Sequence, residues 1–278
     1  MPPGSRTAGR RFWTALARAF AGAVIFSLPL MMTAEMWEIG ATIPPERLLA
    51  LLAGSFPLLV GLSHVVGFED TLDLLDDAVD AFVALGIGLA ASAFLLWLFG
   101  ALPAGIPAGE AIGKIALQAV PGAIGALLSR SQLHSSRDAE REARRRQEED
   151  YGTELFTMVI GALFLALNIA PTEEIQVIAL RLDEWHLLLL MAFSLVAMHG
   201  FVYGLEFRGG TGRARGASWP GITLRFTVPG YVLALVVSLA ALWVFGRTEG
   251  LSFAPLLAIV LVLGFPAALG AAAARLVL

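Results

Sequence analysis

The sequence predicts an all-α, polytopic membrane protein of about eight transmembrane helices, arranged as two parallel four-helix repeats. Three observations lead to this fold class. The 278 residues are 57% hydrophobic and only 15% charged, with a mean hydropathy of +0.75, which lies outside the range of soluble domains. Apolar runs of about 20 residues recur along the chain, the length that a helix needs to cross a bilayer. The two halves of the sequence also resemble each other.

Hydropathy and helix breakers place the eight spans in order along the chain. They are predicted at 15–36, 46–67, 79–100, 108–128, 154–172, 184–205, 226–245 and 252–275. The first run is too long for the apolar region of a signal peptide and no small-residue cleavage motif follows it, so we expect it to remain in the mature protein. The chain has no cysteine, which excludes disulfides and thiolate chemistry.

Positive charges indicate the orientation of these spans. If the N-terminus is cytoplasmic, 4 of the 19 Lys and Arg residues fall outside, namely Arg47, Lys114, Arg181 and Arg247. The positive-inside rule therefore predicts that both termini are cytoplasmic, in a bacterial inner membrane or a plasma membrane. The domains expected are an N-terminal repeat over 1–130, a charged cytoplasmic linker over 131–152 and a C-terminal repeat over 153–278.

The internal repeat rests on matches that shared hydrophobicity does not explain. Gly22, Thr33 and Glu35 correspond without a gap to Gly161, Thr172 and Glu174. WLFG and PGAIGA in the first half later match WVFG and PAALGA in the second, ending each half in the same way. An even number of spans per repeat gives both halves the same orientation, related by an axis along the membrane normal.

The segments ARAFAGAVIFSLPLMMTAEMWEIG and VGFED carry a likeness to a known family. Through them, nearly the whole chain resembles the uncharacterised bacterial integral membrane proteins that are grouped as a domain of unknown function. The resemblance implies a membrane protein and brings no catalytic motif or functional residue with it.

The first candidate site is formed by the duplicated carboxylates Glu35 and Glu174, with Thr33 and Thr172 two residues earlier. Ionisable groups within a bilayer are costly and mark functional sites by default. We expect the two acids to face the interior between the repeats and at least one of them to exchange a proton or bind the transported cation. The helices are expected to break beside Pro29 and Pro171, freeing carbonyl oxygens as further ligands. The alternative places both acids at the headgroups, solvated or paired with arginine.

A second set of acids lies at the predicted cytoplasmic surface. Glu69 and Glu206 end corresponding spans, where an aqueous boundary already explains a carboxylate. Only the first half continues into an acidic stripe, with Asp80 its deepest member and Asp73, Asp76 and Asp77 on the same helical face. The stripe indicates either a rim of ion pairs with arginines of the second half or a vestibule that collects cations.

The remaining polar residues favour structural roles. His64 and His199 lie within spans without metal-ligand spacing, so we expect helix packing or hydrogen bonding. Lys114 follows Glu110 by one helical turn, which predicts an ion pair. Nucleotide-binding and hydrolase motifs are absent, so the sequence predicts no cofactor, no nucleic-acid partner and no enzyme activity, and it leaves the metal question open.

Three classes of function remain open. The first is a transporter or channel for a cation, coupled to protons in one version, whose partners are the lipid bilayer and a small cation or proton. The second is a non-catalytic membrane scaffold or accessory subunit, whose small-residue faces pack helices or the protomers of a homo-oligomer. The third, an enzyme acting on lipids, lacks a pair of nucleophile and base.

Overall fold

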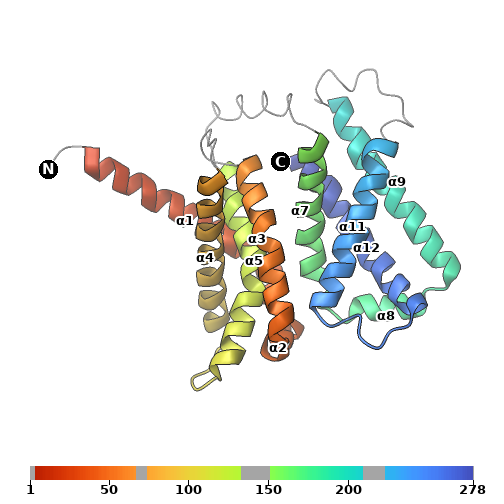
Figure 1. Cartoon of the computed structure of the whole chain (residues 1–278), viewed down its shortest axis with the longest axis horizontal. Helices are drawn as coiled ribbons and strands as arrows, with labels where there is room; N and C mark the ends of the chain where they lie inside the picture. Colours follow the sequence, from red (N-terminus) through yellow and green to blue (C-terminus); the bar gives the residue numbers. More distant parts are fainter. Residues whose placement is uncertain (1–3, 67–73, 133–150, 209–222, 278) are drawn as a thin grey trace. The chain divides into compact units, whose positions relative to one another are not determined.

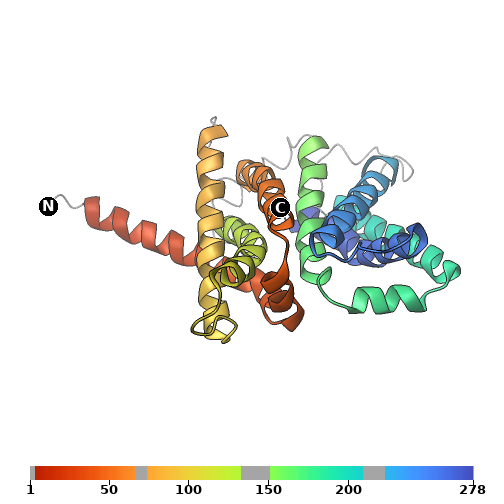
Figure 2. The same ribbon diagram turned by 60° about the horizontal axis from the view of Figure 1, so that its bottom comes forward.

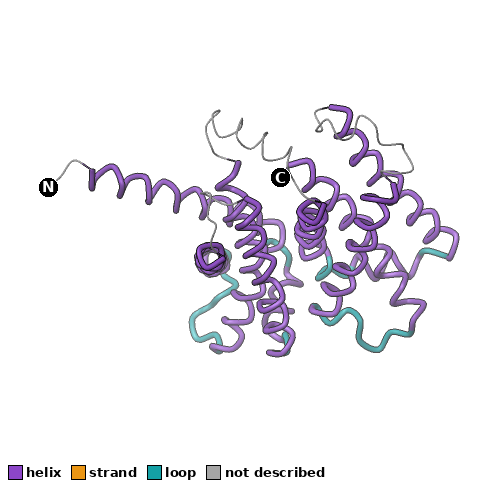
Figure 3. The backbone as a smooth tube through the Cα atoms, turned by 45° about the horizontal axis from the view of Figure 1, so that its top comes forward, coloured by secondary structure: helices purple, strands orange, loops and turns teal. Residues whose placement is uncertain are grey.

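The computed structural model describes residues 4–66, 74–132, 151–208 and 223–277, and helix is the only regular structure in these ranges (Figure 3). Eight of the helices in this part of the chain are long and apolar enough to cross a membrane, which confirms the predicted number of spans. The chain divides into two compact units, Met1–Ser135 and Ser136–Leu278. Most of the predicted 131–152 linker lies outside the described residues, so its boundaries stay a prediction.

In the described residues of unit 1 there are five helices, and the first four pack around the last (Figure 1). They are α1 (Gly4–Met31), α2 (Ala34–Thr42), α3 (Pro45–Val66), α4 (Leu74–Leu98) and α5 (Ala108–Gln132). The membrane-spanning window of α5 is 83% buried, against 44% or less for the other spans of this unit. Its small residues explain why, because alanine and glycine let neighbouring backbones approach closely. The first turns of α1 extend away from the other helices of the unit (Figure 1).

Unit 2 is built from a similar series of elements. It holds α7 (Tyr151–Ile169), α8 (Glu174–Arg181), α9 (Glu184–Arg208), a π-helical turn η2 (Thr223–Thr227), α11 (Val228–Val244) and α12 (Phe253–Val277). Again the last helix, α12, contacts all four of the other α-helices described in this unit. The short α8 runs at a steep angle to α7 (Figure 2).

The predicted helix breaks are confirmed, and they correct the limits of two spans. Span 1 was expected to reach residue 36 and span 5 residue 172, but α1 ends at Met31 and α7 at Ile169. After each end a threonine hydroxyl donates to a carbonyl of the last turn, Thr33 to Leu30 at 2.8 Å and Thr172 to Ile169 at 2.9 Å. These bonds satisfy acceptors that a helix end leaves open.

The short helices α2 and α8 each bury one narrow face. Met36 and Gly40 are the buried residues of α2, and Ile175 and Ala179 those of α8, in both cases one helical turn apart. α2 packs on α5 and α8 on α12. Gly40 is needed for this contact, because a Cβ there would lie 2.7 Å from the Cα of Lys114. The apolar residues that follow Glu174 therefore belong to a docked helix.

Glycines bring α1 into direct backbone contact with α5, and α7 with α12. A Cβ on Gly22 of α1 would lie 2.5 Å from the carbonyl oxygen of Gly125 in α5, and the reverse distance is the same. In unit 2, a Cβ on Gly161 of α7 would overlap the carbonyl oxygen of Gly270 in α12. The duplicated small residues of the sequence therefore pack helices inside each unit.

Candidate functional site

The clearest polar site in unit 1 joins the end of α3 to the start of α4. The Nδ1–H of His64 donates to Oδ2 of Asp77 at 2.9 Å, because an ionised carboxylate can only accept. The Asp77 side chain is only 2% exposed, whereas that of His64 is 65% exposed. The pair therefore connects a buried carboxylate to the surface through one imidazole.

Asp77 occupies a helix end that favours a negative charge. It lies in the first turn of α4, where the positive end of the helix dipole stabilises an anion. Its neighbours in the acidic stripe differ from it, since Asp76 is exposed and Asp80 is half-buried. Asp73 lies outside the described residues, and among those described no three acids or histidines form a group that could hold a metal ion.

Sequence reasoning missed this pair, although it had noted both residues. It favoured Asp80, since that residue is the deepest of the stripe, and considered His64 apart from the acids. The structure instead brings His64 to Asp77, thirteen residues further along the chain. One feature of the sequence could have indicated the pair: a histidine lies in the last turns of one span, and an acidic stripe lies at the start of the next.

Unit 2 has a histidine in the corresponding part of its helix series. His199 of α9 lies 3.0 Å from the hydroxyl of Thr227 and 3.4 Å from that of Thr223, both measured from Nδ1. Thr223 is as far from Asp77 in the sequence as Trp243 is from Trp97, so in the predicted repeat Thr223 would correspond to Asp77. Both histidines form hydrogen bonds between helices, as expected, and the turn η2 that holds the threonines has the π form often found at functional sites.

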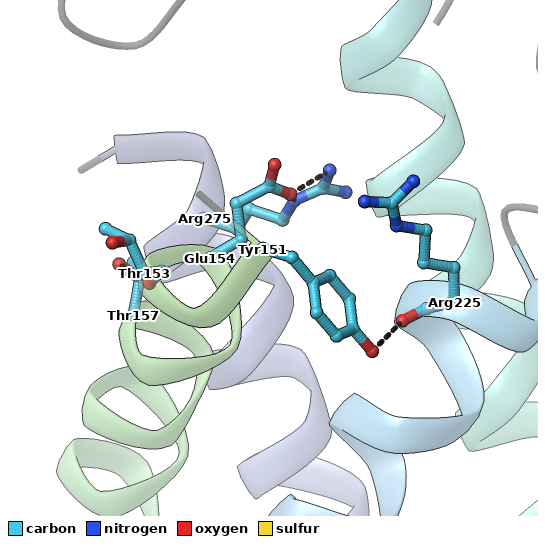
Figure 4. A network of polar contacts seen from close by, with 6 residues as sticks. All are labelled: Tyr151, Thr153, Glu154, Thr157, Arg225 and Arg275. Carbon is cyan, nitrogen blue, oxygen red and sulfur yellow. Dashed lines mark hydrogen bonds and ion pairs between the residues drawn. The ribbon is translucent and has the colours of Figure 1, made fainter. Parts of the chain in front are cut away.

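A second polar network in unit 2 joins α7, η2 and α12 (Figure 4). Arg275 donates to Oε2 of Glu154 from Nε at 2.9 Å and from Nη2 at 2.6 Å. The Tyr151 hydroxyl donates to the carbonyl oxygen of Arg225 at 2.7 Å. These contacts link residues 121 and 74 positions apart, so local sequence patterns gave no sign of them.

The duplicated acids lie at the starts of the short helices. Glu35 is in the first turn of α2 and is half-buried, and Glu174 begins α8 and is exposed. Glu35 belongs to unit 1 and Glu174 to unit 2, and their expected pairing stays a prediction. Their neighbours Thr33 and Thr172 already donate to backbone carbonyls.

The carbonyl oxygen of Pro171 has a different partner from the one expected. It accepts a hydrogen bond from Nη2 of Arg247. The role of this carbonyl oxygen as a cation ligand stays a prediction.

Three further residues complete the comparison with the sequence. Glu69 lies outside the described residues, and Glu206 falls in the last turns of α9 without a described side chain. The predicted ion pair of Lys114 is confirmed, with Nζ 2.6 Å from Oε1 of Glu110. Lys114 Nζ also donates to the carbonyl oxygen of Ala101 at 3.3 Å, so it ties α5 to the loop after α4.

One buried amide lies in the middle of the central span of unit 1. Gln118 of α5 is 0% exposed, and neither its Nε2 nor its Oε1 has a hydrogen-bond partner in the described part of the chain. It lies near the centre of the Ala108–Ser129 span. Leaving a buried polar group unsatisfied costs about 1–3 kcal/mol, so this residue weakens unit 1 unless something polar reaches it.

The eight helices that are long and apolar enough to cross a membrane, in the part of the chain that the structure describes, define an integral membrane protein of several spans. The model of the family described as "Putative integral membrane protein (DUF2391)" matches residues 15–278, and the chain belongs to that family. The resemblance noted in the sequence is thereby confirmed. No curated protein and no solved structure matches the chain.

Proposed function

We propose that the protein moves protons, or a small cation in exchange for protons, across its membrane. The observation that carries this proposal is the pair His64–Asp77, in which a carboxylate only 2% exposed meets an imidazole that is 65% exposed. Histidine is the side chain that most readily exchanges protons near neutral pH. A proton taken up by His64 can therefore pass to Asp77 and neutralise a buried charge.

The cost of a buried charge is what makes such a pair useful. A desolvated carboxylate is stable when it has a partner, and it requires a proton or a cation when the partner leaves. Asp77 would then alternate between pairing with His64 and binding the transported ion. The buried amide of Gln118, deeper in the same unit, supports a path on which a polar ligand passes.

The proposal includes the architecture expected from the sequence. The two units would be copies of one ancestral unit, related by an axis along the membrane normal, with both termini cytoplasmic. The matched glycine crossings of α1 with α5 and of α7 with α12 support this duplication. The protein would act without a cofactor and without enzymatic turnover.

Ion flux in proteoliposomes tests the proposal. Purified full-length chain is reconstituted with a pH-sensitive dye inside, and mono- and divalent cations are added outside in turn. We expect dye responses above those of empty liposomes for protons or for at least one cation. Flux equal to that of empty liposomes for the whole panel would contradict transport and favour the scaffold alternative.

The duplicated acids give a second prediction with matched controls. Glu35→Gln and Glu174→Gln should each abolish the flux or shift its pH dependence to more acidic values, because glutamine keeps the shape and loses the titratable charge. Glu38→Gln and Glu173→Gln change exposed acids beside them and should transport like the wild type. Normal flux in both site variants and in their double variant would place the acids at the headgroups.

A further inference from the structure

Three membrane spans of unit 2 end together at one surface. Tyr151 begins the span of α7, Arg225 begins that of α11, and Arg275 ends that of α12. The hydrogen bonds Tyr151–Arg225 and Arg275–Glu154 join these three ends, so the ends lie at the same depth (Figure 4). A surface at this depth borders the phosphate groups of the lipids.

Aromatic rings form cation–π contacts with both arginines of this surface. The Cζ atom of Arg275 lies 4.1 Å from the centre of the Phe226 ring, and that of Arg225 lies 5.5 Å from the same ring. Arg225 also lies 5.1 Å from the centre of the Tyr151 ring, while its carbonyl oxygen accepts the Tyr151 hydroxyl. A guanidinium stacked in this way loses little freedom when it binds a ligand.

The charges of the cluster do not cancel. Among the described residues of the cluster, Glu154 neutralises Arg275, and the exposed Arg225 leaves one positive charge beside Phe226. α7 begins at Tyr151, so the positive end of its helix dipole adds to this field. The cluster therefore suits a ligand with one negative charge and several hydrogen-bond acceptors.

We infer that Arg225, on its platform of Tyr151 and Phe226, binds the phosphodiester of an anionic lipid. A phosphodiester carries one negative charge, and its two free oxygens match the fork of a guanidinium. A lipid is favoured over free phosphate because the site lies at the end of three spans, where lipid phosphates are concentrated. This inference stands independently of the proposed transport.

Lipid retention measured by native mass spectrometry tests the inference. Full-length protein in detergent is mixed with dioleoylphosphatidylglycerol or dioleoylphosphatidylcholine, and bound lipid is counted at increasing collision energy. We expect R225Q to retain phosphatidylglycerol about fivefold less than the wild type, the effect of one basic residue at a membrane surface. R225K keeps the charge but loses the planar fork, so its retention should be intermediate.

A matched control separates this site from general charge effects. R181Q removes another exposed arginine of unit 2, at the end of α8, and should retain phosphatidylglycerol like the wild type. Equal loss in R181Q and R225Q, or no loss in R225Q, would overturn the inference. Displacement of the lipid by inorganic phosphate at equal concentration would also overturn it, because the ligand would then be a free anion.

Discussion

Asp77→Asn is expected to reduce pH-dependent flux in proteoliposomes to the level of empty liposomes while the protein stays folded. Asparagine has nearly the shape of aspartate and can still accept the Nδ1–H of His64, so the contact between α3 and α4 survives. The substitution removes the only buried carboxylate in the described part of the chain, and this carboxylate is the group proposed to alternate between a proton and a cation.

Asp76→Asn is the matched control for this experiment. Asp76 precedes Asp77 in the same helical turn but is exposed, so its replacement changes the same net charge without touching the pair. Its flux should equal that of the wild type. If the two variants behave alike, either both active or both inactive, then burial of Asp77 is not what the activity depends on, and the proposed role of the His64–Asp77 pair is wrong.

Gly161→Ala is expected to lower the free energy of unfolding by about 1–3 kcal/mol, and Gly161→Val by more. The added Cβ would overlap the carbonyl oxygen of Gly270 and press on Ala274 in α12. Backbone atoms cannot turn aside as a flexible side chain can, so α7 and α12 must separate along their crossing. Thermal unfolding in detergent, followed by circular dichroism, measures the loss.

Gly200→Ala provides the control, with an effect of opposite sign. Gly200 lies in α9, and a Cβ there meets no atom within 4 Å. Alanine at such a place stabilises a helix by roughly 0.5–1 kcal/mol relative to glycine. If the Gly161→Ala protein is as stable as the Gly200→Ala protein, then α7 and α12 do not pack closely enough at Gly161 to exclude a methyl group.

Most of the fold could be predicted from the sequence because the bilayer imposes it. A span must be about 20 apolar residues long, so the eight spans can be recognised without knowledge of their neighbours. The breaks after Met31 and Ile169 could also be predicted, from proline and from the polar residues that follow. The ends of these two spans were predicted several residues too far along the chain. Hydropathy alone does not reveal the hydrogen bonds that Thr33 and Thr172 donate to the last turns of the helices.

The sites were harder to predict, and the reason is geometric. The spacing of the acids along a helix indicates which of them share a face, but it does not indicate which of them faces the neighbouring helix. Asp77 and Asp80 could not be distinguished until α3 was placed beside α4. The Lys114–Glu110 pair was predicted correctly because both residues lie on one helix, whereas Arg275 and Glu154 meet only through the packing of α7 on α12.

The central position of α5 and α12 has a consequence for biosynthesis. Each is the last described helix of its unit to leave the ribosome, yet each contacts every other described α-helix of that unit. The earlier helices are therefore inserted before the helix on which they pack. Until that helix follows, Gly22 and Gly161 lack the backbone contacts that they make in the folded units. All the described helices of unit 1 precede those of unit 2 in the chain, so unit 1 can complete its packing while unit 2 is still being translated.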